Sequence, residues 1–526
     1  MSNLLRMRAD LIIIGGGTGG CAAALAALKT GKTVIMTEET DWIGGQLTSQ
    51  AVPPDEHPWI EEFGCTRSYR TFRESVRCYY KRCFPLAESV DRDRPFNPGR
   101  ANVSAIAHEP RAALAVLRDT LAPYIHSGKL EILYGFRIQR ADASEDTVRT
   151  LTVVRPETGE EIELEAPYYL DATEEGDVLP VAGVDYVTGA ESAADTGEPH
   201  ALQGDADPGD MQAFTYVFAM DHVEGENHTI PKPAQYEFWK SYKAEFWPDN
   251  QLSWAGLVPH TLEPVRYCLF PDGKSFSLWN YRRVIDKEQF AEGTFVSDIT
   301  LVNWPANDYW LGSIIDVSPE ERTKHLENAK QLSLSLLYWM QTEAPRPDGG
   351  RGYPGLRLRG DVVGTRDGLA KSPYIRESRR IRAEFTVVEQ HLSPEFQAGP
   401  AAMDYFDSVG VGCYRIDLHP STALRTYIDV SSLPFQIPLG SLLPAKMNNL
   451  LPAAKNIGTT HITNGCYRLH PVEWNIGEAA GYLAAFCLER GVKPREVRQR
   501  PELLAAYQAV LADAGVQMKW PKVHAV

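Results

Sequence analysis

Three glycines near the N-terminus have the spacing of a phosphate-binding turn. Gly15, Gly17 and Gly20 form G-x-G-x-x-G between the apolar run 11–14 and the alanine-rich stretch 21–28. In a strand–turn–helix unit the first glycine allows a tight turn, the second lets the backbone approach a pyrophosphate, and the third lets the helix lie close to the strand. The start of the helix then offers free N–H groups and a positive dipole end to the phosphates. The pattern predicts a dinucleotide site.

An acidic residue follows at the distance that such a site requires. Residues 32–37 predict a second strand, and Glu38 stands at its carboxyl end. An acid about 20 residues after the glycines binds ribose hydroxyls in dinucleotide-binding folds. The pair Gly44 and Gly45 then predicts a loop whose backbone passes close to a planar ligand. The alternative interpretation is a purely structural βαβ unit with a surface glutamate.

Two later stretches place charged residues among apolar ones. In 371–381 three arginines surround one glutamate, and in 413–420 neither a helix nor a strand period accounts for Asp417 and His419. A buried arginine needs an acidic partner or an anionic ligand. Both stretches therefore contribute candidate site residues, although a solvated helix face or an ion pair would also account for the first.

The elements that must position these residues predict an α/β fold. We expect a Rossmann-type domain with a parallel sheet and a small β-meander, together with a mixed α+β substrate domain. The predicted helices are 61–84, 103–124, 319–342, a small-residue helix from just after Pro471 to about 489, and 501–514. The predicted strands include 129–134, 150–154, 161–166, the run ending at Asp171, 214–220 and the run starting at Asn449.

The middle of the chain is rich in aromatic residues. Seven of the eleven tryptophans fall between residues 190 and 350, which predicts a second domain whose aromatic residues mostly form its core and in part line a substrate cleft. The expected organisation is a discontinuous cofactor-binding domain (1–51, 100–190 and 435–526), a helical excursion (52–99) and a substrate or cap domain (191–434).

Composition excludes several function classes. The 526 residues carry a net charge of −16 without a basic cluster, which argues against nucleic acid or an anionic membrane surface as partner. No apolar segment is long enough to span a membrane, and the N-terminus lacks the features of a secretory signal. The eight cysteines form no C-x-x-C pair, so we expect reduced thiols, no metal site and a cytoplasmic protein.

Taken together, these stretches resemble a known family, the bacterial FAD-dependent oxidoreductases with a glutathione-reductase-type Rossmann domain, which are distantly similar to the fumarate reductase flavoproteins. The resemblance covers both ends of the chain and the region 370–480. It rests on the segments 14–20, 42–49, 171–177, 375–381, 416–420 and 435–481, in this order. It implies bound FAD.

The resemblance also implies a set of cofactor contacts. These are the pyrophosphate at Gly15, Gly17 and Gly20, with Thr18 and Gly19 as further cofactor-binding residues of the same turn, the adenosine ribose at Glu38, the flavin side at Gly44, Gly45 and Gln46, the middle of the cofactor at Thr173 and Asp177, and the ribitol at Asn456, where many relatives carry aspartate. A helix beginning at Asn475 and Ile476 would point its positive end at the flavin N1/O2 edge, which is negative in the reduced flavin.

The implied reaction is hydride transfer from a small organic substrate, at a C–OH, C–N or C–C bond, to flavin N5. Such a reaction needs a base, and histidine suits that role at neutral pH. His419 and His470, with His461 behind them, lie in segments expected to converge on the flavin. Arg379 and Arg468 are the expected groups for holding a carboxylate or polarising a carbonyl.

Other functions remain open at this stage. The protein could instead reduce an activated alkene, modify RNA, or bind FAD without turnover, although the acidic charge disfavours RNA. An NAD(P)H-dependent disulfide reductase is disfavoured because the middle segment holds no second G-x-G-x-x-G, and the C-x-x-x-x-C spacing of Cys78 and Cys83 is interpreted as coincidence. A covalent flavin would point to His57 or Cys65. The electron acceptor and the formation of a homo-oligomer are left open.

Overall fold

A parallel five-stranded sheet lies at the centre of the computed structural model, which describes residues 5–91, 94–144, 146–521 and 523. The strand order is β24-β8-β2-β3-β4, and each neighbouring pair is parallel. Strands covered on both faces are built from continuous apolar runs, as β2 is. The strands are β2 (Leu11–Ile14), β3 (Val34–Glu38), β4 (Leu130–Tyr134), β8 (Tyr168–Asp171) and β24 (Leu450–Pro452). This sheet confirms the predicted α/β class.

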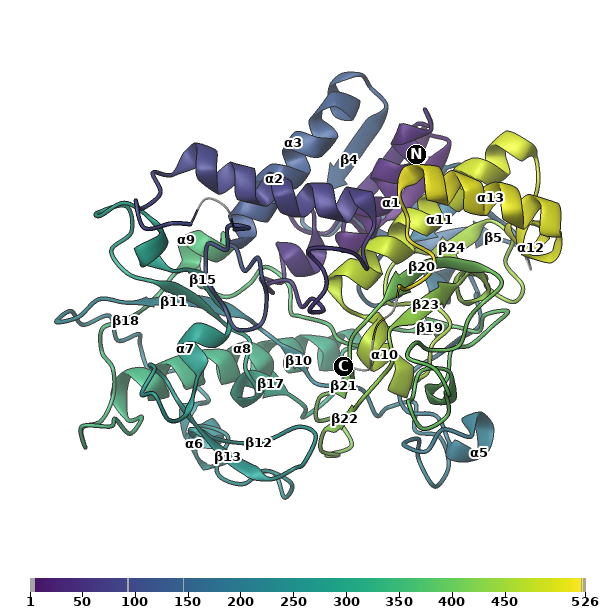
Figure 1. The fold of residues 1–526 in the computed structure, drawn as a ribbon. Helices are drawn as coiled ribbons and strands as arrows, with labels where there is room; N and C mark the ends of the chain where they lie inside the picture. Colours follow the sequence, from purple (N-terminus) through teal and green to yellow (C-terminus); the bar gives the residue numbers. More distant parts are fainter. Residues whose placement is uncertain (1–4, 92–93, 145, 522, 524–526) are drawn as a thin grey trace.

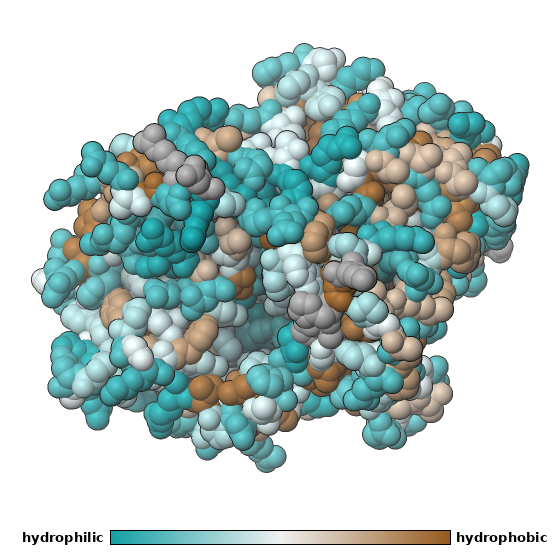
Figure 2. Space-filling view, viewed as in Figure 1, coloured by the Kyte–Doolittle hydropathy of each residue, from teal (hydrophilic) through white to brown (hydrophobic). Residues whose placement is uncertain are grey.

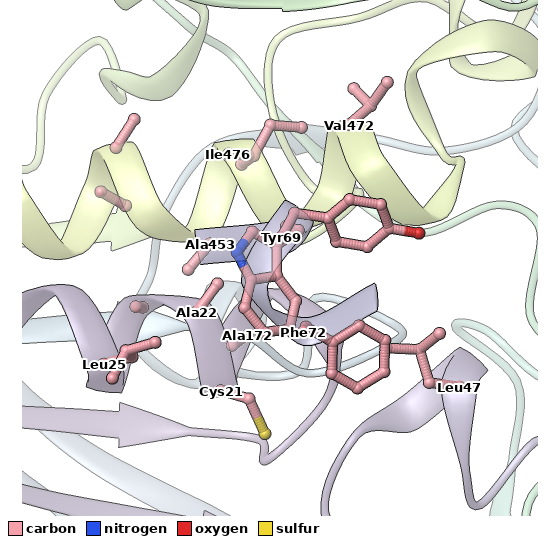
Figure 3. Close-up of a cluster of buried hydrophobic side chains, with 14 of the residues drawn as sticks. Cys21, Ala22, Leu25, Leu47, Tyr69, Phe72, Ala172, Ala453, Val472 and Ile476 are labelled. Carbon is pink, nitrogen blue, oxygen red and sulfur yellow. The ribbon is translucent and has the colours of Figure 1, made fainter. Parts of the chain in front are cut away.

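Two helices from opposite ends of the sequence pack side by side on this sheet (Figure 1). They are α1 (Thr18–Lys29) and α11 (His470–Arg490). A Cβ at Gly477 would lie 2.0 Å from the carbonyl oxygen of Gly19, so only glycine allows this approach. Figure 3 shows the apolar contact between them, with Ala22 on α1 and Ile476 on α11. The small residues of both helices therefore determine how closely the N- and C-terminal segments pack.

A four-stranded sheet lies next to the main sheet and contains the predicted meander. Its order is β1-β7-β6-β5, with antiparallel pairs except for β1, which runs parallel to β7. The strands are β1 (Leu5–Arg8), β5 (Arg137–Ala143), β6 (Val148–Arg155) and β7 (Glu160–Glu165). The prediction found β6 and β7 but missed β1 and β5, because both are mostly polar and exposed.

Further helices pack around the apolar core that contains the main sheet. They are α2 (Arg67–Cys83), α3 (Pro110–His126), α10 (His461–Tyr467), α12 (Pro494–Gln499) and α13 (Pro501–Ala514). The bounds of α13 are those predicted. The predicted starts of α2 and α3 were six to seven residues early, because Thr66 caps α2 with its hydroxyl and Pro110 occupies the first turn of α3.

The segment from β10 to α9, which we call the cap, contains the aromatic-rich residues and fills the lower left of Figure 1. Its largest sheet has the order β15-β16-β11-β18, and the helix α8 (Pro319–Thr342) has the predicted bounds. The other elements are β10 (Phe214–Thr215), β11 (Phe218–His222), α6 (Tyr236–Ser241), β12 (Ala255–Leu257), β13 (Pro264–Cys268), β14 (Phe276–Ser277), α7 (Leu278–Tyr281), β15 (Arg283–Ile285), β16 (Ile299–Val302), β17 (Asp308–Tyr309), β18 (Leu356–Leu358) and α9 (Gly360–Val363).

The aromatic residues of the cap are mainly core, as predicted. All seven tryptophans between residues 190 and 350 are buried. The predicted strand 214–220 is divided, because β10 pairs with β17 whereas β11 pairs with β16 and β18. Cap residues such as Ala219 and Leu301 belong to the same core as the main sheet, so the two parts share an apolar interior.

Short elements connect the cap with the main sheet. They are α4 (Val178–Val181), β9 (Tyr186–Val187), α5 (Ala193–Thr196), β19 (Arg380–Ile381), β20 (Ser408–Gly412), β21 (Ile416–Leu418), β22 (Ile428–Val430), β23 (Phe435–Pro438) and 3₁₀ turns at Gly45–Leu47, Lys287–Gln289, Pro305–Asn307, Glu389–His391 and Leu439–Leu442. The 191–434 domain boundary stays a prediction. Val409, Ile416 and Leu433 from its end pack in the core of the main sheet.

Candidate functional site

The glycine-rich turn between β2 and α1 has the predicted geometry. Gly15 has a φ of +99°, which residues with a Cβ rarely adopt. A Cβ at Gly20 would lie 2.1 Å from the carbonyl oxygen of Gly15, so the helix can start this close to the strand only with glycine there. Gly17 is the N-cap of α1 and supplies no capping side chain. The first N–H groups of the helix can therefore serve a ligand.

Thr18 and Gly19 contact other parts of the protein. The Thr18 hydroxyl donates to the carbonyl of Gly44 at 2.9 Å, and the Gly44 N–H donates to the carbonyl of Gly16 at 2.7 Å. The two glycine-rich loops are thereby held against each other. The N–H of Gly19 donates to Oε1 of Glu473 at 3.3 Å. Gly19 therefore faces α11, whereas the prediction counted it among the cofactor-binding residues.

A cavity runs along the carboxyl ends of β2, β3 and β8, where ligands bind in open α/β sheets. It extends past the glycine-rich turn to Ser49 and Gln50 and to the segment 371–375. Both polar atoms of the buried Gln50 amide lack a hydrogen-bond partner among the described residues. Of the predicted cofactor residues, those that line the cavity are Gly15, Gly17, Glu38, Gly45, Thr173 and Asp177.

Glu38 lies at one end of this cavity with its carboxylate held in place. Its Oε1 accepts hydrogen bonds from the N–H of Thr40 at 2.8 Å and from the Thr40 hydroxyl at 2.7 Å. Burial raises the pKa of Glu38 to about 7. Thr40 occupies one carboxylate oxygen, and the backbone N–H of Gly16 also favours the ionised carboxylate.

The segment after β8 is folded back on itself. Oδ1 of Asp171 accepts from the Thr173 hydroxyl at 2.7 Å, and this hydroxyl accepts from the N–H of Asp177 at 2.7 Å. Arg379 pairs with Asp177 and with Asp316, both at 2.9 Å. The structure thus places Arg379 in an ion-pair network at the wall of the cavity, away from the predicted histidines.

A buried charged cluster lies behind the glycine-rich turn. The Gln46 amide donates to Glu473 and to the carbonyl of Arg468, the latter at 3.0 Å. Lys455 pairs with Glu473 at 3.3 Å between Nζ and Oε2, and with Glu174. The sequence analysis missed Lys455, Glu174 and Glu473. The one available signal was an acidic residue in the first turn after Pro471, where a helix N-terminus favours negative charge.

Three residues predicted to contact the cofactor have other positions or partners. Asn456 forms hydrogen bonds within the fold, and Asn475 and Ile476 do not lie at the start of a helix. The Asn456 amide donates to the carbonyl of Asp171 at 3.0 Å and accepts from the N–H of Ala454 at 3.2 Å, so it joins β24 to β8. Helix α11 begins at His470, because Pro471 fits the first turn of a helix. Asn475 and Ile476 therefore lie inside the helix, and their backbone cannot form its positive end.

His419 lies in a partly exposed charged cluster between the cap and the main sheet. Its Nδ1 is 2.6 Å from Oδ2 of Asp308, which is fully buried. Asp308 also pairs with Arg376 at 3.0 Å, and Nε2 of His419 is 3.7 Å from Asp417. The His419 side chain retains 18% of its exposure. The face of the molecule drawn in Figure 2 is hollowed near its centre. His419 is therefore oriented by a carboxylate and reachable from solvent.

Two aspartates of this cluster stay ionised despite burial. Burial would raise the pKa of Asp308, but Arg376 and His419 outweigh it and hold the pKa below its ordinary value. The pKa of Asp417 is likewise lowered, because His419 and Arg468 outweigh the effect of burial. The cluster therefore offers fixed negative charge on both sides of the imidazole.

Arg468 joins this cluster to the cavity. Its guanidinium donates to the Tyr374 hydroxyl at 2.7 Å and pairs with Asp417 at 3.1 Å. Pro373 and Ile375, on either side of Tyr374, line the cavity. His419 and Arg468 therefore approach the same carboxylate, that of Asp417, at 3.7 and 3.1 Å.

The other two histidines have different surroundings. His470 is fully buried, and its Nδ1 accepts from the N–H of Asp55 at 3.1 Å. Burial, with the nearby Arg282, holds the pKa of His470 well below its ordinary value, so the ring is neutral. His461 lies 2.9 Å from the carboxylate of Glu377 and is also buried. None of the three histidines, His419 included, is among the residues that line the cavity.

The cysteines give no sign of redox chemistry at this site. Cys78 and Cys83 are exposed on α2 and its C-terminal end. Cys65 is buried, which raises the pKa of its thiol to about 11, and His57 is buried against Gly64. None of these four residues lines the cavity. In the part of the chain that the structure describes, no group of three His, Cys, Asp or Glu could hold a metal ion.

The residues of the cavity fit FAD. The glycine-rich turn forms a cradle that a Cβ would fill, Glu38 presents a carboxylate oxygen one strand away, and the unpartnered amide of Gln50 lies towards the other end. Such a sequence of groups matches ribose, diphosphate and a polar ring system along one extended ligand.

No helix within the described ranges is long and apolar enough to cross a membrane.

Several solved structures are similar to this chain. A geranylgeranyl bacteriochlorophyll reductase-like protein from Thermoplasma acidophilum aligns with 98% of this chain and 85% of its own, at 11% identity and a TM-score of 0.33. The 3-ketosteroid-delta4-(5alpha)-dehydrogenase from Rhodococcus jostii RHA1 aligns with 34% of this chain at 16% identity and a TM-score of 0.21. The L-proline dehydrogenase from P. horikoshii aligns with 36% at 17% identity and a TM-score of 0.17. The chain spans 49% of the ketosteroid dehydrogenase and 25% of the proline dehydrogenase.

The chain also matches a family model, and the cofactor of that family fits the cavity and the glycine-rich turn. No curated protein sequence matches the chain. The model of the FAD dependent oxidoreductases matches residues 10–511, which is nearly the whole chain. The chain therefore belongs to the family of FAD dependent oxidoreductases, and it is an oxidoreductase with FAD as its cofactor.

Proposed function

We propose that this protein dehydrogenates a small organic substrate at a C–OH, C–N or C–C bond, with His419 as the base. Bound FAD supplies the hydride acceptor for this chemistry. The observation that carries the proposal is the pair formed by His419 and the buried Asp308, with 2.6 Å between Nδ1 and Oδ2. An imidazole fixed by a carboxylate, with an arginine-bound aspartate on its other side, is suited to proton removal.

The hydrogen bond to Asp308 assigns the tautomer of His419. An ionised carboxylate only accepts hydrogen bonds, so Nδ1 carries the proton. Nε2 is then the free basic nitrogen, and its distance of 3.7 Å to Asp417 is too long for a hydrogen bond. Nε2 can therefore take a proton from a substrate, and the two aspartates stabilise the imidazolium that forms.

Arg468 supports the same reaction from the cofactor side. Its hydrogen bond to the Tyr374 hydroxyl and its pair with Asp417 fix the guanidinium next to the cavity. A fixed guanidinium can polarise a carbonyl or hold an anionic group of the substrate. We therefore assign Arg468 to substrate orientation. We assign Arg379 a structural role instead, because its ion pairs hold the segment after β8.

The test is reduction of the bound flavin by candidate substrates without oxygen. Hydroxy acids, amino acids and polyols are mixed with the purified holoenzyme, and bleaching of the oxidised flavin identifies a substrate. His419→Asn should slow this reduction about 10²- to 10⁴-fold, the contribution of a general base. The exposed His126→Asn is the matched control and should reduce at the normal rate.

Two results would refute this assignment. Reduction of the His419→Asn enzyme at the rate of the unmodified protein would remove His419 as the base. Oxidation of the reduced enzyme by activated alkenes, with no reduction by any donor of the set, would reverse the proposed direction of the reaction.

A further inference from the structure

Arg282 is a buried guanidinium with few hydrogen bonds. It follows α7 in the cap, and its side chain retains 8% of its exposure. Its Nη2 donates to the Tyr281 hydroxyl at 3.4 Å, whereas Nε and Nη1 have no partner among the described residues. A buried charged donor without a partner is costly, so such groups commonly mark the place of a bound polar group.

Asp55 neutralises Arg282 but does not occupy its donors. Oδ1 of Asp55 is 3.5 Å from Nη1 of Arg282, and both atoms lack a hydrogen bond within the described ranges. An ion pair without hydrogen bonds leaves the fork of the guanidinium open. Nε and Nη1 lie on different edges of the guanidinium, so a ligand with two adjacent acceptor atoms takes one of them together with Nη2.

These unpartnered groups lie near the segment that holds Arg468. The N–H of Asp55 donates to His470, the first residue of α11. Arg282 and Arg468 both interact electrostatically with Asp55 and Tyr374. Nε of Arg468 is also buried without a partner in the described structure. Both arginines thus carry buried N–H groups without a partner among the described residues, and both feel the charge of Asp55.

We infer that the substrate is a carboxylate and that Arg282 binds its carboxylate group, with Arg468 as a second donor. This inference rests on the proposed function, because it names the substrate class of the same site. A guanidinium matches a carboxylate with two parallel N–H···O bonds. The charge of Asp55 makes the region less positive, which favours a monoanion over a doubly charged phosphate.

The inference is tested by binding of redox-inert probes to the holoenzyme. Propionate and butyrate are compared with propionamide and butyramide, by calorimetry and by the change that each causes in the flavin absorption spectrum. The acids should bind about tenfold tighter or more than the amides, as expected for hydrogen bonds to a charged group. Methyl phosphate is the third probe and should bind more weakly than propionate.

Variants of Arg282 identify the group responsible. Arg282→Gln should abolish the preference for acids over amides, and Arg282→Lys should keep part of it. The exposed Arg266→Gln on β13 is the matched control and should bind the probes as the unmodified protein does. FAD content and the unfolding temperature are measured for each variant. If Arg282→Gln does not fold, Arg282→Lys and the acid–amide comparison on the unmodified protein decide.

Equal binding of acids and amides, tighter binding of methyl phosphate, or an unchanged preference in the Arg282 variants would overturn the inference. These results are separable from failure of the proposed function. If carboxylates bind through Arg282 but no donor reduces the flavin, the dehydrogenase proposal fails alone. If a neutral donor reduces the flavin in a His419-dependent way, the carboxylate inference fails alone.

Discussion

Lys455 and Glu473 form an ion pair in which neither side chain is exposed to solvent. Lys455 also pairs with Glu174, and Glu473 accepts the N–H of Gly19 at the start of α1. Burial would lower the pKa of Lys455, but the two carboxylates outweigh it and hold the pKa above its ordinary value. One ammonium group is therefore shared between two acidic side chains beside the expected diphosphate site.

Lys455→Met should weaken FAD binding and destabilise the fold. The substitution leaves Glu174 uncompensated, and Glu174 lies against both glycine-rich loops, with Oε1 2.7 Å from a Cβ built at Gly17 and 2.5 Å from one at Gly45. Breaking one side of a buried ion pair costs about 3–5 kcal/mol. The measurements are FAD affinity by titration of the apoprotein and the free energy of unfolding.

A second substitution separates charge from packing. Because the uncompensated charge of Glu174 causes the predicted loss of affinity, Glu174→Gln in the Lys455→Met background should restore much of the FAD binding. If the double variant binds FAD as weakly as Lys455→Met, repulsion by Glu174 is not the cause. The exposed Lys274→Met in the cap serves as the control and should leave FAD affinity unchanged.

The sequence predicts most of the scaffold because its signals are local. The apolar run before Gly15 and the helical periods of 319–342 and 501–514 depend on neighbouring residues, and the observed α8 and α13 have these bounds. The helix end next to the cavity was misplaced. Asn475 lies inside α11, since Pro471 is compatible with the first turn and lets the helix begin at His470.

The charged groups of the site could be predicted only in part, because their partners are distant in the sequence. His419 and Asp417 stood out as polar residues in an apolar stretch. Their partner Asp308 belongs to the cap, and nothing near it in the sequence indicates the pairing. The partners of Arg282 and Lys455, Asp55 and Glu174, are likewise distant in the sequence. Their unusual surroundings arise from long-range packing, which a local pattern does not encode.

FAD affinity should depend on pH through Glu38. Burial raises the pKa of Glu38 to about 7, and a ribose hydroxyl needs the ionised carboxylate as acceptor. Below pH 7 the carboxylate must lose its proton before it binds, so affinity should fall by up to about tenfold per pH unit. Glu38→Gln should bind FAD more weakly at pH 8 and lose this dependence between pH 8 and pH 5.5.

The comparison is made by titrating apoprotein with FAD at several pH values. The mostly exposed Glu131→Gln on the neighbouring β4 keeps Glu38 intact and should show the pH dependence of the unmodified protein. An affinity of the unmodified protein that is constant from pH 8 to pH 5.5 would show that Glu38 does not accept a hydrogen bond from the cofactor.

Gly477→Ala should destabilise the protein although alanine is the better helix former. On propensity alone, replacing a glycine inside a helix by alanine stabilises it by about 1 kcal/mol. At Gly477 the added Cβ would lie 2.0 Å from the carbonyl oxygen of Gly19, and a backbone atom cannot move away as a flexible side chain can. Overpacking of this kind costs about 1–3 kcal/mol, so α1 and α11 must separate. Since α1 begins at the glycine-rich turn, FAD affinity should fall with stability.

Gly204→Ala is the control, because a Cβ there meets no described atom within 4 Å. Thermal unfolding with and without FAD measures both effects, and a Gly477→Ala protein as stable as the Gly204→Ala protein would show that the helices do not need this close approach.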